Sequence, residues 1–318
     1  MNPKYLVFGT GALGSVFGGF LLKASCDVTF IGLGSHYEEI VQNGIKITGI
    51  WGDHHIKGIR GFRSVAELHA KGEKFDIVLF CVKSIDSETT AADAASLLKP
   101  DGIMVSIQNG LNNVETIAKV AGNQRTVGGR IIFGVEIPQP GIAKVTVYAD
   151  KVLLGEPFGS VNKDLLQKLS ADLNNAGIPT EIVSNIMAFI WGKVLYNSAL
   201  NPLGAILGVA YGKLGENEET KFIMEKIIQE IFEILKVKRV KTPYRDYKDY
   251  FDVLIQKQLP PTREHHSSMF QDILHGRKTE INALNGAIVQ YGKELGIPTP
   301  YNELITNLIL FKEKNHTK

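Results

Sequence analysis

The chain has 318 residues, of which 44% are hydrophobic and 21% charged, and its formal net charge is +2. This composition is typical of a globular protein large enough for two domains, and so small a charge does not indicate nucleic acid as the main partner. Cys26 and Cys81 are the only cysteines, which argues against a disulfide scaffold or a cysteine-based metal site and favours a reducing cytoplasm.

The first third of the chain alternates short β-rich runs with helix-like stretches. The runs at 5–8, 28–31, 77–82 and 103–107 are almost continuously apolar, as in parallel strands that are covered on both faces. The pattern predicts an α/β fold with a doubly wound, Rossmann-type sheet. The stretch 5–22 carries no charge, but five glycines interrupt it and no cleavage motif follows, so we expect no membrane association.

A glycine-rich loop follows the first expected strand directly and opens a helix-compatible run. It reads Gly9-Thr10-Gly11-Ala12-Leu13-Gly14. The G-x-G-x-x-G spacing allows a tight turn, close approach of the backbone to a pyrophosphate, and close packing of helix on strand. The loop therefore predicts dinucleotide binding, with the phosphates at the helix N-terminus.

The end of the second expected strand bears on the choice between NAD and NADP. This position normally carries an acid for the NAD ribose or a basic residue for the NADP phosphate. Here the chain reads Ile31-Gly32-Leu33-Gly34-Ser35-His36, with neither an acid nor an arginine. Ser35 and His36 are candidates for a phosphate contact, and Lys83 is a candidate for added charge from a neighbouring loop; an ordinary surface loop is the alternative for all three.

Gln108-Asn109-Gly110 follows the strand expected at 103–107, at the edge where open α/β sheets bind ligands. Asn109 is a candidate to bond the ribose or the nicotinamide, and a plain Asn-Gly turn is the alternative. Two further strands are expected at 142–147 and 152–154, so that the sheet ends near Gly155. A helix at 164–175 follows.

After about residue 181, strand signals vanish and helical periodicity dominates. We therefore expect a dinucleotide-binding Rossmann domain at 1–180 and an all-helical substrate and catalytic domain at 181–318. The helices are expected at 186–200, 219–235, 247–258, 267–274, 280–295 and 302–311.

Three polar residues at four-residue spacing, Lys193, Asn197 and Asn201, interrupt the apolar helix expected at 186–200 and its end. They share one helical stripe, which can hold a small polar molecule. Apolar neighbours surround Lys193, and burial lowers a lysine pKa towards values useful for donating a proton. The alternative is a snorkelling lysine and asparagines that bond a neighbouring loop. Pro202 is expected to kink or stop the helix just after Asn201.

Downstream, Ser267 and Ser268 stand at an expected helix start, where either one can be the N-cap. Glu280 falls in the first turn of the next expected helix, where the helix dipole favours an acid in any case. The adjacent His265 and His266 point about 100° apart on a helix, and no carboxylate stands at ligand spacing, so no metal site is expected.

Together, these motifs resemble the ketopantoate reductase family, the 2-dehydropantoate 2-reductases, in order over nearly the whole chain. The resemblance rests on the glycine loop, Cys81-Val82-Lys83-Ser84, Gln108-Asn109-Gly110, the row Lys193/Asn197/Asn201-Pro202, Ser267-Ser268-Met269-Phe270-Gln271-Asp272, and Thr279-Glu280-Ile281. It implies a Rossmann domain joined to a helical domain, with the active site in the cleft between them.

The resemblance also implies residue roles. Lys193 matches the lysine that protonates the ketone oxygen, and Glu280 matches an acid that contacts the cofactor and that lysine. Asn197, Asn201 and Ser268 match residues that hold the substrate, Lys83 matches a residue near the cofactor, and Asn109 is expected to serve both ligands. The implied reaction is NADPH-dependent reduction of 2-dehydropantoate to (R)-pantoate in pantothenate and coenzyme A synthesis, by a cytoplasmic monomer or homodimer.

Two positions depart from the family pattern. Leu33 stands where members commonly have an arginine, which leaves NAD open beside NADP. Tyr211 stands where they often have a substrate-binding asparagine, which leaves another small 2-oxo acid open as the substrate. A dinucleotide-binding sensor without activity is the third alternative, and the presence of both Lys193 and Glu280 argues against it.

Overall fold

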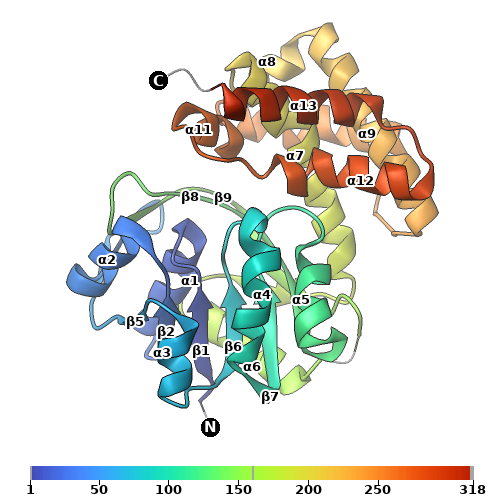
Figure 1. Cartoon of the computed structure of the whole chain (residues 1–318). Helices are drawn as coiled ribbons and strands as arrows, with labels where there is room; N and C mark the ends of the chain where they lie inside the picture. The colour runs from blue at the N-terminus through green and yellow to red at the C-terminus, as the bar shows by residue number, and fades with distance from the viewer. Residues whose placement is uncertain (1, 160, 316–318) are drawn as a thin grey trace. The chain divides into compact units, whose positions relative to one another are not determined.

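The computed structural model describes residues 2–159 and 161–315. The chain forms two compact units, which are coloured by residue number in Figure 1. The first unit comprises Met1–Gln108 and Asn113–Ile186, and the second comprises Asn109–Asn112 and Met187–Lys318. The second unit therefore includes four residues from the middle of the first half of the sequence.

The first unit is built on one β-sheet. Its strands are β1 (Lys4–Phe8), β2 (Asp27–Ile31), β3 (Ile45–Gly49), β4 (His54–Ile56), β5 (Arg60–Phe62), β6 (Phe75–Phe80), β7 (Leu98–Ser106), β8 (Thr126–Glu136), β9 (Ile142–Gly155) and β10 (Thr180–Ile182). Parallel strands run in the order β5-β2-β1-β6-β7-β8. This is the strand order 3-2-1-4-5-6 of a Rossmann fold, so the predicted doubly wound sheet is confirmed.

The sheet extends beyond these parallel strands. β9 pairs antiparallel with β8, β3 pairs parallel with β9, and β4 pairs antiparallel with β3. The two strands expected at 142–147 and 152–154 are one strand, β9. The sheet also does not end near Gly155, because β10 pairs with β9 at Val152–Leu154. β10 has three residues, too few to show a sequence period.

Helices cover both faces of this sheet (Figure 1). They are α1 (Ala12–Lys23), α2 (Gly34–Asn43), α3 (Val65–Ala70), α4 (Ser87–Ser96), α5 (Asn113–Ala121) and α6 (Lys163–Asn175), with short turns η1 (Ser84–Asp86) and η2 (Asn123–Arg125). Tyr5 and Val7 of β1 belong to one hydrophobic core, and Leu6 and Phe8 belong to another. Consecutive side chains of a strand point to opposite faces, which explains the continuously apolar sequence of the parallel strands.

The regular elements described in the second unit are all helices or short helical turns. Its elements are α7 (Ile186–Leu207), α8 (Tyr211–Glu216), α9 (Glu218–Lys238), α10 (Tyr247–Val253), η3 (Leu254–Gln258), η4 (Pro260–Thr262), α11 (Ser268–Leu274), η5 (Ile281–Ala283), α12 (Asn285–Leu295) and α13 (Pro300–Lys314). α9 contacts α8, α10, α12 and α13. Within the described ranges, no helix combines the length and the apolar character needed to cross a membrane.

Of the two outcomes expected after Asn201, a kink or a stop, the stop does not occur, because α7 continues through Pro202 to Leu207. A proline has no N–H for the carbonyl four residues earlier, which here belongs to Ser198. The amide of Asn285 donates to this Ser198 carbonyl at 3.1 Å. A side chain from α12 therefore supplies the hydrogen bond that Pro202 cannot make.

The helix expected at 280–295 is interrupted. The turn η5 and the helix α12 are separated by Leu284, which has φ −107° and ψ −106°. The carbonyl of Ala283 accepts a hydrogen bond at 2.7 Å from the N–H of Leu111, outside the helix. Amphipathic periodicity alone does not reveal such a break, because both pieces place apolar residues in the core.

Candidate active site

The glycine-rich loop has the backbone geometry that its spacing predicts. Gly9 has φ +104°, and a Cβ there would lie 2.8 Å from the backbone nitrogen of Val82. A Cβ on Gly14 would lie 2.0 Å from the carbonyl oxygen of Gly9. Side chains at these two positions would clash with backbone, so the loop requires glycine at both.

The N-terminus of α1 fits a pyrophosphate. Its N-cap, Gly11, makes no side-chain capping bond, and the first turn contains no acidic residue. A Cβ on Gly11 would meet nothing within 4 Å, so the backbone here faces open space. Uncapped N–H groups and the helix dipole favour an anion at this position. Lys83, which precedes η1 at the carboxyl end of β6, is exposed at the same edge of the sheet.

His36 does not provide a positive charge for a ribose phosphate. Its Nδ1 accepts a hydrogen bond from the backbone N–H of Gly141 at 3.1 Å, and its Nε2 lies 2.9 Å from Oγ of Ser15. An accepting Nδ1 leaves the single proton of a neutral ring on Nε2, which donates to Ser15. Burial also lowers the pKa of His36. Both ring nitrogens of His36 therefore have partners within the protein, whereas Ser35 is exposed, and a phosphate contact by either residue stays a prediction.

A cation that sequence reasoning missed lies near the end of β2. Ile31 of β2 pairs with Phe62 of β5, so Arg63 follows β5 at the same edge as Leu33. Leu33 is 75% exposed, and Arg63 forms an ion pair of 2.5 Å with Glu38 of α2. β5 has only three residues, Arg-Gly-Phe, and this short strand gave no signal in the sequence.

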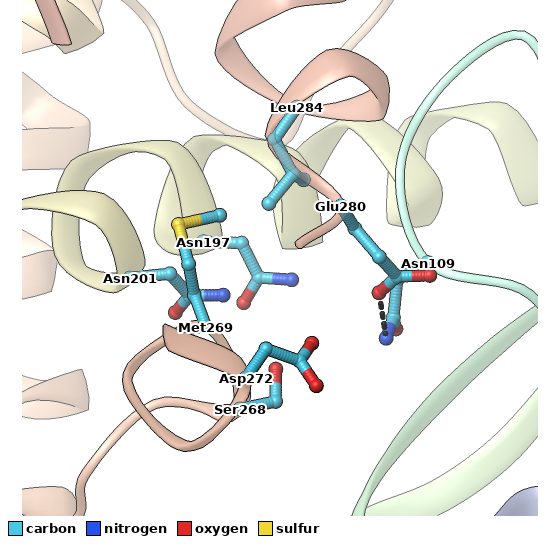
Figure 2. A pocket seen from close by; sticks show the side chains of 8 residues that line it. All are labelled: Asn109, Asn197, Asn201, Ser268, Met269, Asp272, Glu280 and Leu284. Carbon is cyan, nitrogen blue, oxygen red and sulfur yellow. Dashed lines mark hydrogen bonds between the residues drawn. The ribbon is translucent and has the colours of Figure 1, made fainter. Parts of the chain in front are cut away.

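A polar cavity lies in the second unit (Figure 2). Together with the solvent space at its mouth, the cavity spans about 240 Å³. The lining residues are Asn109, Asn197, Asn201, Ser268, Met269, Asp272, Glu280 and Leu284.

Lys193, Asn109 and Glu280 form a hydrogen-bonded chain beside this cavity. The amine of Lys193 donates to Oδ1 of Asn109. The amide nitrogen of Asn109 donates in turn to Oε2 of Glu280 at 3.0 Å, which Figure 2 marks with a dashed line. Asn197 and Asn201 follow Lys193 along α7, one and two turns further. The spacing of the row thus places the lysine and both asparagines at one site.

The segment that carries Asn109 is fixed to the helical unit and is not a plain surface turn. Gly110 has φ +89°, and a Cβ there would lie 2.4 Å from the carbonyl oxygen of Ala283. Leu111 donates to that same oxygen, and Asn112 accepts a hydrogen bond from the hydroxyl of Tyr291. These contacts hold the Asn109 amide between Lys193 and Glu280.

The structure assigns different positions to the two serines. Ser267 is the N-cap of α11: its Oγ accepts from the N–H of Phe270 at 3.0 Å and donates to the carbonyl of Asn201 at 3.1 Å. Ser267 is 2% exposed, whereas Ser268 lines the cavity. The hydroxyl available to a ligand is therefore that of Ser268.

Sequence reasoning missed Met269, Asp272 and Leu284 as lining residues. Asp272 is 9% exposed and pairs with Nε of Arg277 at 3.0 Å. Asp272 stands four residues after Ser268 on the same helix. This spacing places both side chains on one helix face, and it is the sequence signal that could have identified Asp272.

In the part of the chain that the structure describes, no group of histidine, cysteine or acidic side chains could hold a metal ion.

Comparison with known proteins gives the chain its family. The family model described as Ketopantoate reductase PanE/ApbA matches residues 5–157, and its C-terminal counterpart matches residues 185–313. A 2-dehydropantoate 2-reductase of Aquifex aeolicus is 38% identical over 98% of both chains. The chain belongs to the ketopantoate reductase family. A 2-dehydropantoate 2-reductase of Pyrococcus horikoshii is 31% identical over 98% of this chain and 97% of its own.

Solved structures of this family and of a related dehydrogenase have the same fold. A PanE/ApbA family ketopantoate reductase from Ralstonia eutropha has a TM-score of 0.86 at 28% identity, covering 98% of this chain and 99% of its own. A D-mandelate dehydrogenase in a ternary structure with NADH and anilino(oxo)acetate has a TM-score of 0.87 at 25% identity, covering 98% of both chains.

Proposed function

We propose that the protein reduces 2-dehydropantoate to (R)-pantoate with a nicotinamide dinucleotide, and that Lys193 donates the proton. One observation carries the proposal: the chain Lys193–Asn109–Glu280 stands beside a small polar cavity lined by Asn197, Asn201 and Ser268, in a member of the ketopantoate reductase family. The cavity combines hydrogen-bond donors with an ammonium group, as an oxygen-rich acid requires.

The bound nicotinamide supplies hydride to the carbonyl carbon, and the protein residues manage the charge that develops. Negative charge grows on the carbonyl oxygen during reduction, so an ammonium aimed at this oxygen stabilises the transition state more than the ground state. Asn109 accepts from the Lys193 amine and orients it, while the Glu280 carboxylate lies one amide away. Asn197, Asn201 and Ser268 hold the acid by hydrogen bonds.

We infer that the dinucleotide is NADPH, bound by Gly9–Gly14 and Lys83. The uncapped start of α1 supports the pyrophosphate position. Arg63 supports a preference for the 2′-phosphate. It follows β5 at the same edge of the sheet as Leu33, the position where the family commonly has an arginine. An arginine can bind a phosphate through two parallel hydrogen bonds. The phosphate would draw Arg63 from its ion pair with Glu38.

The test follows nicotinamide absorbance with 2-dehydropantoate and a panel of small 2-oxo acids. Lys193→Ala should lower kcat by about 10²–10⁴-fold, the range for loss of a general acid, while calorimetry shows dinucleotide binding unchanged. Lys213→Ala, which removes an exposed lysine paired with Glu216, is the matched control and should leave kcat unchanged. No turnover of any acid by the wild type contradicts the proposed reductase, and unchanged kcat in Lys193→Ala contradicts the proton donor.

A second candidate substrate is an aryl 2-oxo acid. It is favoured by the similarity to the D-mandelate dehydrogenase described with anilino(oxo)acetate. The same panel decides between the two, because a higher kcat/KM for phenyl-2-oxoacetate than for 2-dehydropantoate would identify an aryl acid reductase.

The free cysteines Cys26 and Cys81 support a reducing compartment, and we propose the cytoplasm. Light scattering would distinguish a monomer from a homodimer.

A further inference from the structure

Tyr211 lies behind the cavity and not in its wall. It is the first residue of α8 and 3% exposed, and it is absent from the residues that line the cavity. Its hydroxyl donates a hydrogen bond of 2.5 Å to Oδ1 of Asn201, which does line the cavity. The hydroxyl of Tyr211 is therefore connected to the cavity through Asn201.

The Tyr211 ring has little freedom to move. It makes edge contacts with Tyr196 and His265, at 5.9 and 5.2 Å between ring centroids. Its backbone N–H donates to the carbonyl of His265 at 3.1 Å. Burial, with a smaller contribution from Tyr196, raises the pKa of Tyr211 well above its usual range, so the hydroxyl keeps its proton and remains a donor.

The orientation of the Asn201 amide follows from this contact. An asparagine side chain has one accepting oxygen and one donating nitrogen, and either can face a ligand if nothing fixes the amide. A buried tyrosine hydroxyl needs an acceptor, and Oδ1 of Asn201 provides it. The amide nitrogen is then the atom left for the cavity, and in Figure 2 it points to the side of Asn197.

We propose that Tyr211 is a specificity-determining residue that fixes Asn201 as a hydrogen-bond donor to the substrate. The inference rests on the proposed function, because it concerns the acid bound in this cavity. A fixed donor favours a substrate oxygen that accepts, such as a carboxylate, and disfavours a group that must donate at this position.

The test separates KM from kcat in three single variants. Tyr211→Phe keeps the ring and removes the hydroxyl, and we expect KM for 2-dehydropantoate to rise about tenfold, with kcat within about threefold, because a buried hydrogen bond that orients a binding group is lost. Tyr196→Phe is the matched control. It removes a hydroxyl that bonds Oγ1 of Thr262 at 2.8 Å, in the same aromatic group but without contact to Asn201, and KM should not change. The third single variant is Asn201→Ala.

A double-mutant cycle then distinguishes positioning from packing. If Tyr211 acts through Asn201, the Tyr211→Phe change should not raise KM further in an Asn201→Ala background. An equal rise of KM in both backgrounds, or an equal effect of Tyr196→Phe, would overturn the inference. If the wild type reduces a different 2-oxo acid, the proposed substrate fails and the same cycle is run on that acid. If it reduces none, calorimetric binding of pantoate replaces KM in the cycle.

Discussion

At Asn109, one amide separates an ammonium from a carboxylate. The Asn109 amide accepts from the Lys193 amine through its oxygen and donates to the Glu280 carboxylate through its nitrogen, so this single residue orients the lysine. This is the residue-scale feature on which the proposed chemistry depends.

The proposed cofactor preference also depends on single residues. Arg63→Gln should weaken binding of 2′,5′-ADP about tenfold while leaving 5′-ADP unchanged, because only the former carries the phosphate that Arg63 is proposed to contact. Glu38→Gln should act in the opposite direction, since it releases Arg63 from the ion pair. Leu33→Arg should strengthen 2′,5′-ADP binding as well. Isothermal calorimetry measures all three, and equal binding of both nucleotides by Arg63→Gln and the wild type would show that the phosphate is bound elsewhere.

At this scale, sequence patterns succeeded where the partners are close in the chain. The spacing of Lys193, Asn197 and Asn201 on one helix predicted their shared stripe, because helical geometry alone sets it. No local pattern reveals that Asn109 accepts from Lys193 and donates to Glu280, since these contacts span 84 and 171 residues. Arg63 was missed because the strand that it follows, β5, has only three residues and gives no sequence signal.

The helix α7 carries Lys193, Asn197 and Asn201, and it runs through Pro202. Asn285 joins three elements there: its amide donates to the Ser198 carbonyl of α7 and, at 3.0 Å, to Oδ1 of Asn302 in α13. Glu230 of α9 accepts from Asn302 and caps the start of α13 through two backbone N–H groups. A buried polar network therefore supports the helix turn that holds Asn197 and Asn201.

We expect Asn285→Ala to lower the free energy of unfolding of the helical unit by about 2 kcal/mol, because it leaves the buried Ser198 carbonyl without a partner. Pro202→Ala restores a backbone N–H at that carbonyl. Added to Asn285→Ala, it should recover part of the loss, although Asn302 still lacks its donor. Urea unfolding followed by Trp191 fluorescence in a Trp51→Phe background reports on this unit. No recovery in the double variant would show that Asn285 acts through Asn302 alone.

Among the elements, the long apolar helices and parallel strands were predictable because their period is repeated several times. The short strands β5 and β10 were not, since three residues cannot establish a period. The continuation of α7 was also not predictable, because the donor that replaces the proline N–H comes from Asn285, far along the chain. Proline rules describe local backbone and omit such distant partners.

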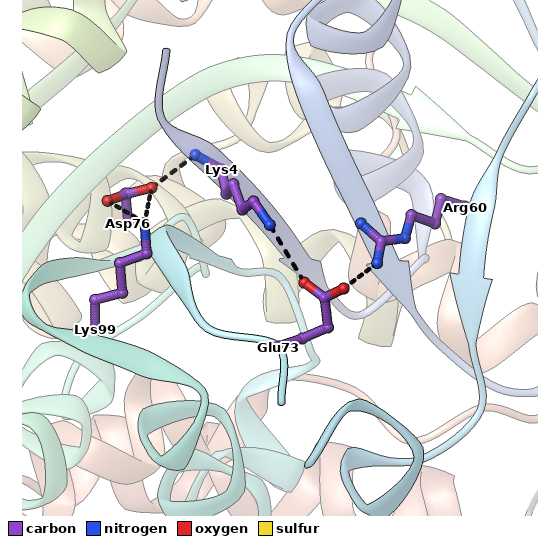
Figure 3. Close-up of polar contacts among 5 residues, drawn as sticks. All are labelled: Lys4, Arg60, Glu73, Asp76 and Lys99. Atoms are coloured by element: carbon purple, nitrogen blue, oxygen red, sulfur yellow. Dashed lines mark hydrogen bonds and ion pairs between the residues drawn. The ribbon is translucent and has the colours of Figure 1, made fainter. Parts of the chain in front are cut away.

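At the scale of the whole sheet, a network of ion pairs lies at the amino ends of parallel strands (Figure 3). Glu73 pairs with Arg60 of β5 and with Lys4 of β1, the latter at 3.6 Å. Asp76 of β6 accepts from the backbone N–H of Lys4 and from the amine of Lys99 in β7, both at 2.8 Å. Two carboxylates thus connect four strands, at the end of the sheet opposite the glycine-rich loop.

This network predicts acid sensitivity of the Rossmann unit. Burial alone would raise the pKa of Glu73, but the hydrogen bond and charge of Arg60, with Lys4, hold it below its usual value; Lys4 and Lys99 do the same for Asp76. A carboxyl pKa that is lower in the folded state contributes stability above the unfolded pKa of about 4, and this is lost as pH falls through the folded value. Stability should therefore decrease below about pH 5.

Glu73→Gln should lower the free energy of unfolding of the Rossmann unit by about 1 kcal/mol at pH 7. It should also make the fall of this free energy at acid pH less steep. Unfolding followed by Trp51 fluorescence in a Trp191→Phe background isolates this unit from the helical one. Glu294→Gln, at an exposed carboxylate of α12 that pairs with Gln290, is the control and should change neither quantity. An acid profile of Glu73→Gln parallel to that of the wild type would remove the network as its cause.

The four residues Asn109–Asn112 have a consequence for recombination within the family. Although they follow β7 in sequence, they belong to the compact helical unit and contribute Asn109 to its polar cavity. A gene split or a chimaera joined near residue 186 would therefore separate the proposed catalytic lysine from the amide that orients it. To exchange halves between relatives with retention of function, the tetrapeptide would have to be transferred together with the C-terminal half. It would be inserted between β7 and β8 of the recipient's Rossmann unit.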